Sequence, residues 1–227
     1  MRGFRRLLSA KCALCSCMCV VILLFIIKIL HSDRHWYKRE APCEYSSQHV
    51  ANQSKLTDII NGVLTEKGVG YFLCYGSLFG ALRLGKSLPW DPDVEFCLIS
   101  FEQMYAKEEI YSWFEQNNVR VHYNYFEDLY EIKLGQVVAE IIFFEYNDDF
   151  TQLERKLLFG TTDRFPSELV SPPLKKLKFH EQQVPVPNGD VDIQKHFYPE
   201  DWWQQVKPLY CGERKKPVHG HDHHHHH

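Results

Sequence analysis

Hydrophobic and polar positions alternate or recur at regular spacing over most of the chain. Apolar residues three and four positions apart are typical of amphipathic helices, whereas short β-prone runs bounded by turn residues indicate strands. Four helices are predicted in this way, at residues 54–66, 78–84, 101–116 and 151–159. Strands are predicted at residues 71–75, 93–99, 119–126, 129–134, 137–146, 176–179 and 183–186. The pattern predicts an α+β fold over residues 54–212, in which the three runs between 119 and 146 form an antiparallel meander.

A separate apolar run at residues 13–30 follows a basic N-terminal stretch. About 18–20 helical residues cross the hydrocarbon core of a bilayer, so the run is long enough for one transmembrane helix. Positive residues before the span stay on the cytosolic side. We therefore predict a type II Golgi or ER membrane protein whose catalytic domain is lumenal. A cleaved signal peptide is the alternative, but no A-x-A-like site follows the run.

This topology divides the chain into five parts. Residues 1–12 form a cytosolic tail, 13–30 the anchor, 31–53 a short lumenal stem, 54–212 the folded domain, and 213–227 a tail that is basic and then His-rich. The His-rich segment fits a purification tag as well as a native tail. A glycosylation sequon at Asn52 agrees with a lumenal location.

The eight cysteines fall into two groups. Four lie at or inside the predicted span, where palmitoylation or simple apolar packing accounts for them. Of the other four, Cys43 and Cys211 flank the domain and can pair in an oxidising compartment, whereas Cys74 and Cys97 lie in predicted strands and are expected to be buried.

The composition argues against a nucleic-acid-binding protein and in favour of a globular domain. The formal net charge is −3, and no basic run alternates with aromatic residues, so nucleic acid is not an expected partner. Hydrophobic residues make up 44% of the chain and charged residues 24%, values ordinary for a globular domain with a real core.

Three acids, Asp91, Asp93 and Glu95, are spaced two residues apart at the start of a predicted strand. Alternate residues of a strand share a face, so these carboxylates crowd together, and a cation would neutralise their repulsion. Oxygen ligands alone suit Mg²⁺ or Mn²⁺. A solvated edge-strand face is the alternative interpretation.

Two further features make the cation interpretation more specific. Gly76-Ser77 ends a strand and opens a helix, a geometry whose free backbone N–H groups bind anions such as phosphate. Glu140 lies in the apolar run 137–144, where a single acid is costly unless it is paired or bound to a metal. A salt bridge is the alternative explanation for Glu140.

These segments resemble a known family. The stretch from Tyr75 to Arg83 (YGSLFGALR), followed by that from Leu88 to Glu95 (LPWDPDVE), is similar to the signature of the LicD/fukutin-related family. The resemblance continues in AEIIF from Ala139, in residues 173–188, and in HFYPEDW from His196. It extends from Tyr71 to Trp203.

The resemblance implies a nucleotidyltransferase-like fold, a mixed sheet with flanking helices, and a Mg²⁺-dependent phosphotransferase. Such an enzyme moves ribitol phosphate, phosphocholine or a similar group from a CDP-linked alcohol to a hydroxyl of a glycan or glycoprotein. By the same resemblance, Asp93 and Glu95 hold the metal with Asp91 beside them, and Glu140 is a further catalytic carboxylate that acts as metal ligand or general base. The residues implied in donor binding are Gly76, Ser77, Arg83, Trp90 and Asn188.

The sequence departs from the family pattern at three positions. Glu95 and Glu140 stand where Asp is usual, and Pro92 stands where a polar residue is usual. Because Glu95 and Glu140 are longer than Asp, the alternatives include a catalytically impaired relative and a glycan- or transferase-binding partner. A further alternative is a Golgi glycosyltransferase that uses a nucleotide sugar, because Asp91-Pro92-Asp93 is also a D-x-D motif.

Overall fold

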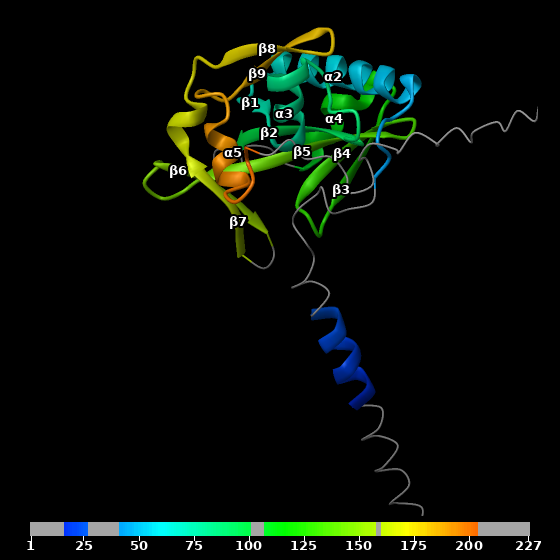
Figure 1. Ribbon diagram of the computed structural model, residues 1–227, viewed down its shortest axis with the longest axis vertical. Coiled ribbons are helices and arrows are strands. Elements are labelled where there is room, and N and C mark those ends of the chain that lie inside the picture. Colours follow the sequence, from blue (N-terminus) through cyan, green and yellow to red (C-terminus); the bar gives the residue numbers. More distant parts are fainter. Residues whose placement is uncertain (1–15, 27–40, 101–106, 158–159, 204–227) are drawn as a thin grey trace, which may run out of the picture. The chain divides into compact units, whose positions relative to one another are not determined.

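The computed structural model describes residues 16–26, 41–100, 107–157 and 160–203 (Figure 1). The chain divides into two units, one made of Met1–Glu40 and Pro208–His227 and the other of Ala41–Lys207. In the first unit the described residues form a helix at 16–26, whose side chains are exposed. No helix within the described ranges has the length and apolar content to cross a membrane. Residues 13–15 and 27–30 of the predicted span lie outside those ranges.

In the second unit, helices and strands alternate at first and a run of strands follows. The helices are α2 (Ser47–Lys67), α3 (Tyr75–Leu84), α4 (Lys107–Phe114) and α5 (Asp192–Phe197), with 3₁₀ turns η2 (Glu115–Asn117) and η3 (Ser167–Val170). The strands are β1 (Tyr71–Leu73), β2 (Asp93–Ser100), β3 (Arg120–Asn124), β4 (Leu129–Leu134), β5 (Val137–Tyr146), β6 (Gln152–Leu157), β7 (Gly160–Pro166), β8 (Lys175–Phe179) and β9 (Gln182–Val186).

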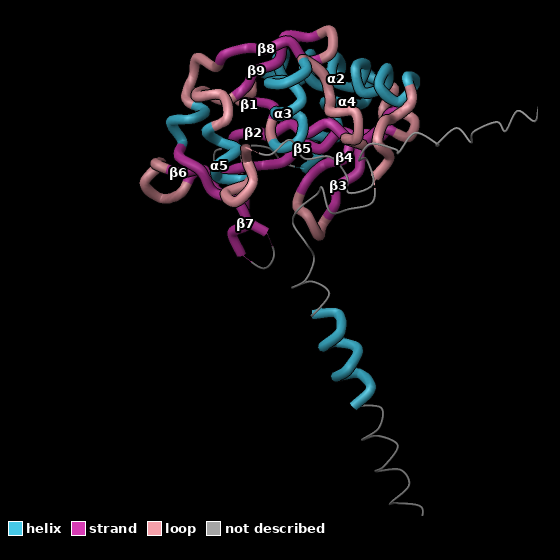
Figure 2. The backbone as a smooth tube through the Cα atoms, viewed as in Figure 1, coloured by secondary structure: helices cyan, strands magenta, loops and turns pink. Residues whose placement is uncertain are grey.

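Seven of the described strands form one mixed sheet (Figure 2). Its central order is β1-β2-β5-β4-β3, and β6 and β7 continue from the far end of β5. Only the central pair, β2 and β5, is parallel among the described pairings. Strands β8 and β9 form a separate hairpin. The predicted α+β class with a mixed sheet and flanking helices is confirmed.

Helices cover one face of the central strands. Tyr71 of β1 donates its hydroxyl hydrogen bond to Asn61 of α2, and Tyr111 of α4 contacts Tyr130 of β4 edge to face. On the other face, Phe144 of β5 packs against Phe165 of β7 and Phe197 of α5. The core therefore has one layer on each face of the sheet.

Helix α2 starts earlier than the sequence predicted. Ser46 caps it by accepting a hydrogen bond from the His49 N–H at 3.2 Å, and the helix continues to Lys67. Residues 47–53, which the sequence analysis assigned to the stem, therefore belong to this helix. Polar residues dominate the exposed side of the first turns, and they concealed the helical period. The sequon residue Asn52 lies in these turns of α2.

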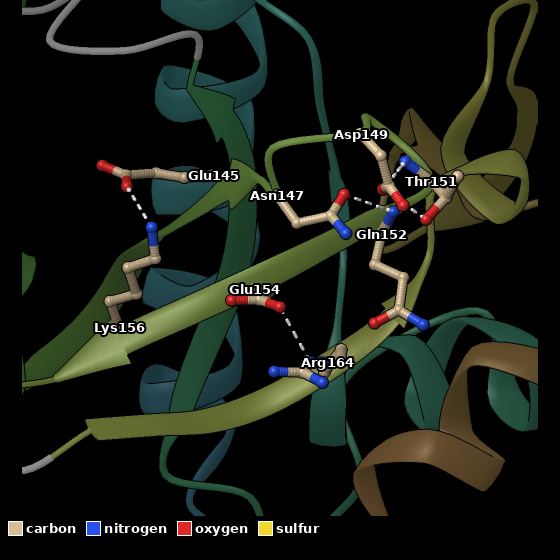
Figure 3. Close-up of polar contacts among 8 residues, drawn as sticks. All are labelled: Glu145, Asn147, Asp149, Thr151, Gln152, Glu154, Lys156 and Arg164. Atoms are coloured by element: carbon tan, nitrogen blue, oxygen red, sulfur yellow. Dashed lines mark hydrogen bonds and ion pairs between the residues drawn. The ribbon is translucent and has the colours of Figure 1, made fainter.

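The predicted helix at 151–159 is wrong, because residues Gln152–Leu157 form β6. Asp149 accepts hydrogen bonds from Thr151 N–H and hydroxyl, at 3.0 and 2.6 Å, which reverses the chain after β5 (Figure 3). Glu154 then pairs with Arg164 across the β6–β7 ladder at 2.9 Å. The alternation of Leu153 with polar neighbours suits a strand, and these cross-strand contacts override the helix propensity of Glu, Arg and Lys.

Two cysteines expected only to be buried form a disulfide. Cys74 and Cys97 are fully buried and bonded, joining the residue after β1 to the middle of β2. Cys43 is also disulfide-bonded, and Cys211, its predicted partner, lies outside the described residues.

The Cys74–Cys97 bond closes a loop with a sequence separation of 23. We expect the double variant Cys74→Ala/Cys97→Ala to lose about 2–4 kcal/mol of unfolding free energy, because the cross-link restricts the unfolded chain. Urea denaturation followed by circular dichroism measures this loss. The matched control is Cys17→Ala/Cys19→Ala, which removes two exposed free thiols. Equal stability of the two double variants would contradict the prediction.

Candidate functional site

The three acids of the D-x-D-x-E segment meet at the start of β2. One carboxylate oxygen each from Asp91, Asp93 and Glu95 lies within 4.8 Å of the other two. Their two-residue spacing places them on the same face, as the strand period requires. The parallel register pairs Glu95 with Glu140 of β5, so the fourth acid lies beside them on that face. The structure thus brings together all four carboxylates predicted to act in the site.

Burial and mutual repulsion both act on these carboxylates. Burial, followed by the charge of Asp93, raises the pKa of Asp91 well above its ordinary value, and burial with the charges of Asp93 and Asp91 does the same for Glu95. Burial and the charge of Asp93 raise the pKa of Glu140 to about 8. In the absence of a counter-ion, the cluster therefore holds protons that isolated carboxyls release near pH 4.

The Gly-Ser turn at the start of α3 packs directly on the acids. Ser77 N–H donates to Glu95 Oε2 at 3.2 Å, and Glu95 N–H donates to Ser77 Oγ at 2.8 Å. A Cβ at Gly76 would lie 2.6 Å from Asp91 Oδ2 and 3.2 Å from Glu95 Oε2. The absence of a side chain at Gly76 is thus what lets the turn approach the carboxylates.

The donor chemistry of the cluster fits a divalent cation. Asp91 Oδ2 is buried and accepts no hydrogen bond from the described residues. Buried acceptor atoms almost always have a hydrogen-bond partner, so a ligand such as a cation is expected at this oxygen. Carboxylate oxygens grouped in this way suit Mg²⁺ or Mn²⁺, for which Asp91, Asp93 and Glu95 would be the protein ligands.

A buried glutamine fixes the backbone of the acidic segment. Gln53 of α2 is 1% exposed and donates from Nε2 to the carbonyls of Asp91 and Asp93, at 2.9 and 3.4 Å. Sequence reasoning placed Gln53 in the stem. Its spacing from Leu56, Thr57 and Ile60, which share the buried side of α2, was the signal that could have found it.

Tyr75, which precedes the Gly-Ser turn, is held in a left-handed conformation with φ of 46°. This conformation is unfavourable for a bulky residue and persists only where surrounding contacts enforce it. The Tyr75 hydroxyl donates to Asp163 Oδ2 at 2.9 Å, its ring stacks on Phe197 at 4.3 Å, and its carbonyl accepts from Gln194 Nε2 at 2.7 Å. Strand β7 and helix α5 therefore hold the turn in place, a role that the sequence did not reveal.

Arg155 of β6 connects Tyr75 to the acids. Its Nη2 donates to the Glu127 carbonyl at 2.8 Å, and its positive charge acts to lower the pKa of both Tyr75 and Glu140. Because a helix was predicted at 151–159, the sequence analysis did not identify Arg155 as part of the site.

The remaining predicted donor-binding residues are Trp90, Arg83 and Asn188. Trp90 is half-buried in the turn closed by the Asp91 N–H to Leu88 carbonyl hydrogen bond of 3.0 Å, so it directly adjoins the acids. Arg83 lies in the last turn of α3, where its guanidinium is 4.3 Å from the centre of the Phe79 ring. Asn188 donates to the Ser171 carbonyl at 2.9 Å and thereby ties the end of β9 to η3; its described hydrogen bonds do not involve the acids.

Replacing Gly76 with Ala should displace the Asp91 carboxylate, because the new methyl group would overlap its oxygen. A displacement of about 1 Å in a preorganised site costs roughly 100-fold in function. We expect Gly76→Ala to weaken Mg²⁺ binding by at least tenfold in calorimetric titration. The control is Gly62→Ala in α2, where an added Cβ meets no atom within 4 Å. Unchanged Mg²⁺ affinity in Gly76→Ala would contradict this geometry.

Stability should depend on pH in a way that Mg²⁺ reverses. Because the folded pKa of Glu140, about 8, exceeds the ordinary value of 4.5, its contribution to stability is complete below about pH 4 and is lost as the pH rises through 8. Mg²⁺ binds the ionised carboxylates, so its stabilising effect should grow from pH 5 to pH 8.5. At 100 times the dissociation constant the stabilisation is about 2.7 kcal/mol.

Thermal unfolding in Mg²⁺ and in EDTA, at each pH, measures this difference. Mg²⁺ is preferable to transition metals because the His-rich tail binds it weakly. Glu140→Gln should flatten the pH dependence. A Mg²⁺ effect that is absent, or equal at both ends of the range, would disagree with the prediction.

Comparison with known proteins identifies a family that matches this chain. Residues 68–189 match the family described as LicD/FKTN/FKRP, nucleotidyltransferase domain. No match was found among curated protein sequences.

Solved structures show weaker similarity. The lincomycin-bound crystal structure of the lincosamide antibiotic adenylyltransferase LnuA has a TM-score of 0.45 and 14% identity, over 63% of this chain and 85% of that one. The crystal structure of ANT(2")-Ia with adenylyl-2"-tobramycin has a TM-score of 0.42 and 14% identity, over 60% and 68%. The solution structure of the antibiotic-resistance factor ANT(2'')-Ia has a TM-score of 0.45 and 13% identity, over 69% and 79%.

The matched segment covers more than half of the 227 residues and contains all four clustered carboxylates and the Gly-Ser turn. The chain belongs to the LicD/FKTN/FKRP nucleotidyltransferase-domain family.

Proposed function

We propose that this protein is a Mg²⁺-dependent phosphotransferase that moves a phospho-alcohol from a CDP-linked donor to a glycan hydroxyl. The observation that carries the proposal is the packing of the Gly76-Ser77 turn against the carboxylates of Asp91 and Glu95, with Asp93 and Glu140 beside them on the same face. Family membership supports phosphate-group transfer in general, and the clustered acids supply the charge that a cation-dependent mechanism needs.

The residues divide into those that hold the donor and those that act on the acceptor. Asp91, Asp93 and Glu95 would hold Mg²⁺, which when bound neutralises charge on the donor phosphates. The Gly76-Ser77 turn, at the N-terminus of α3, offers its positive dipole end to a phosphate, and Arg83 and Trp90 would complete the donor pocket.

Glu140 would serve as the general base. It would take the proton from the acceptor hydroxyl as the oxygen attacks the phosphorus that carries the alcohol. A new oxygen–phosphorus bond forms, the bond from that phosphorus to the bridging oxygen breaks, and CMP leaves with the electron pair. The remaining residues position the two substrates, since catalysis of this kind rests on alignment and charge stabilisation.

We further propose a lumenal location for the domain, with the membrane anchor at residues 13–30. The buried Cys74–Cys97 disulfide and the bonded Cys43 support this, because disulfides persist in oxidising compartments.

A CMP-release assay on the full chain tests the activity. The donor panel is CDP-ribitol, CDP-choline and CDP-glycerol, each with Mg²⁺ and with EDTA. We expect Mg²⁺-dependent release from at least one donor, and a loss of roughly 100-fold or more in Asp93→Asn, because the metal's charge stabilisation is worth several kcal/mol. Asp190→Asn is the matched control, since Asp190 is an exposed acid paired with Lys175.

Three outcomes would overturn the proposal in different ways. Absence of release from every donor would favour a catalytically impaired relative or a binding partner. Stabilisation by UDP- or GDP-sugars, but by no CDP-alcohol, would favour a glycosyltransferase. Equal activity of Asp93→Asn and wild type would remove the acid cluster from the mechanism.

A further inference from the structure

A cleft with a volume of about 380 Å³ opens beside the acid cluster. Its inner end is lined by Asp93 and Glu140, and it extends from there over β4 and the β4–β5 turn. The Gly-Ser turn and the rest of α3 contribute no residue to its lining. The cleft is thus a separate space that shares two carboxylates with the site described above.

The sheet order places the acids between the turn and the cleft. Helix α3 packs on β1 and β2, at one side of the acids, and the cleft lies over β5 and β4, at the other. The ladders pair Glu95 with Glu140, and Glu140 with Glu131 of β4, so these side chains form one row across the same face. A substrate in the cleft therefore approaches the acids from the side opposite the turn.

One wall of the cleft is aromatic and fixed. The Tyr45 and His49 rings stack at 4.1 Å with an interplanar angle of 21°. His49 Nε2 is hydrogen-bonded to the Pro92 carbonyl at 2.9 Å, which ties the pair to the residue between the first two acids. Apolar faces of this kind bind the C–H face of a sugar ring, while the phenol hydroxyl remains available for polar contacts.

The strand side of the cleft carries paired donors and acceptors. Lys133 Nζ lies 2.5 Å from Glu131 Oε2, both side chains are partly exposed, and the amide of Gln136 is exposed at the rim. Ammonium, carboxylate and amide groups side by side match hydroxyls, each of which donates and accepts. Because Glu131 balances Lys133 and more acids lie behind, the cleft has no net positive charge to attract an anion.

We propose that this cleft binds the acceptor, a neutral sugar or polyol whose reacting hydroxyl is directed at Glu140. This assignment rests on the proposed phosphotransferase function. In an in-line displacement the attacking oxygen and the leaving group lie on opposite sides of the phosphorus. A donor held by the Gly-Ser turn and the cation leaves this side of the acids free for the attacking hydroxyl.

The kinetic test measures the KM for the donor and the KM for the acceptor separately. Full-chain wild type, Lys133→Met and Tyr45→Leu are assayed with the best CDP-alcohol and with neutral para-nitrophenyl glycosides of galactose, xylose and N-acetylgalactosamine as acceptors. We expect the KM for the acceptor to rise about tenfold or more in Lys133→Met, the effect of losing one hydrogen bond to a charged group, and to rise in Tyr45→Leu because the aromatic wall of the cleft is lost. The KM for the CDP-alcohol should stay within about twofold. Lys175→Met, at an exposed ion pair outside the cleft, should leave both values unchanged.

A rise in the donor KM alone would assign the cleft to the nucleotide, and an unchanged acceptor KM would remove the cleft from acceptor binding; either result overturns the proposal. If wild type releases no CMP, the proposed function fails, and the cleft is judged separately by binding. Saturation-transfer NMR should detect glycoside binding to wild type and Lys175→Met, and its loss in Tyr45→Leu. Absence of glycoside binding to wild type at millimolar concentration, or equal binding to Tyr45→Leu, would also overturn it. Circular dichroism confirms that each variant is folded.

Discussion

Repulsion between partly buried carboxylates is the constraint on which the rest of this structure depends. The parallel pairing of β2 with β5 sets Glu95 beside Glu140, and the strand period sets Asp93 and Asp91 on the same face. An arrangement of this kind costs free energy unless protons or a cation neutralise it, and the raised pKa of Glu140 is the sign of that cost. The β2–β5 pair lies at the centre of a large apolar core. The free energy gained by burying that core offsets the cost of the clustered acids.

The elements around the acids each restrict one part of the site. Gln53 fixes the backbone that carries the first two acids, and the disulfide from Cys74 holds the beginning of α3 against β2. Tyr75 connects that turn to β7 and α5, which lie far away in sequence. A strained φ at Tyr75 persists because these independent contacts converge on one residue. The site is therefore positioned by the whole domain, and the signature motif supplies only its centre.

Local patterns predicted the parts of the fold in which local and tertiary preferences agree. The strands at 129–134 and 137–146 have the bounds expected from their turn residues, and the two-residue spacing of the acids correctly placed them on one face. The 151–159 segment failed because its pairing with β5 and β7, which the run of charged residues does not reveal, overrides its local helix propensity. The same limit applies to the Cys74–Cys97 bond and to the contacts of Gln53, which depend on chain segments brought together only by the sheet.

The central claim, that the β2–β5 carboxylates form a divalent-cation site, is tested most directly by anomalous diffraction from crystals grown with Mn²⁺. The account predicts an anomalous peak within coordination distance of the carboxylate oxygens of Asp93 and Glu95, with Asp91 beside it. Peaks on the His-rich tail do not bear on the claim. A well-ordered acid cluster without a peak, at a pH of 8 or above and millimolar Mn²⁺, would contradict it.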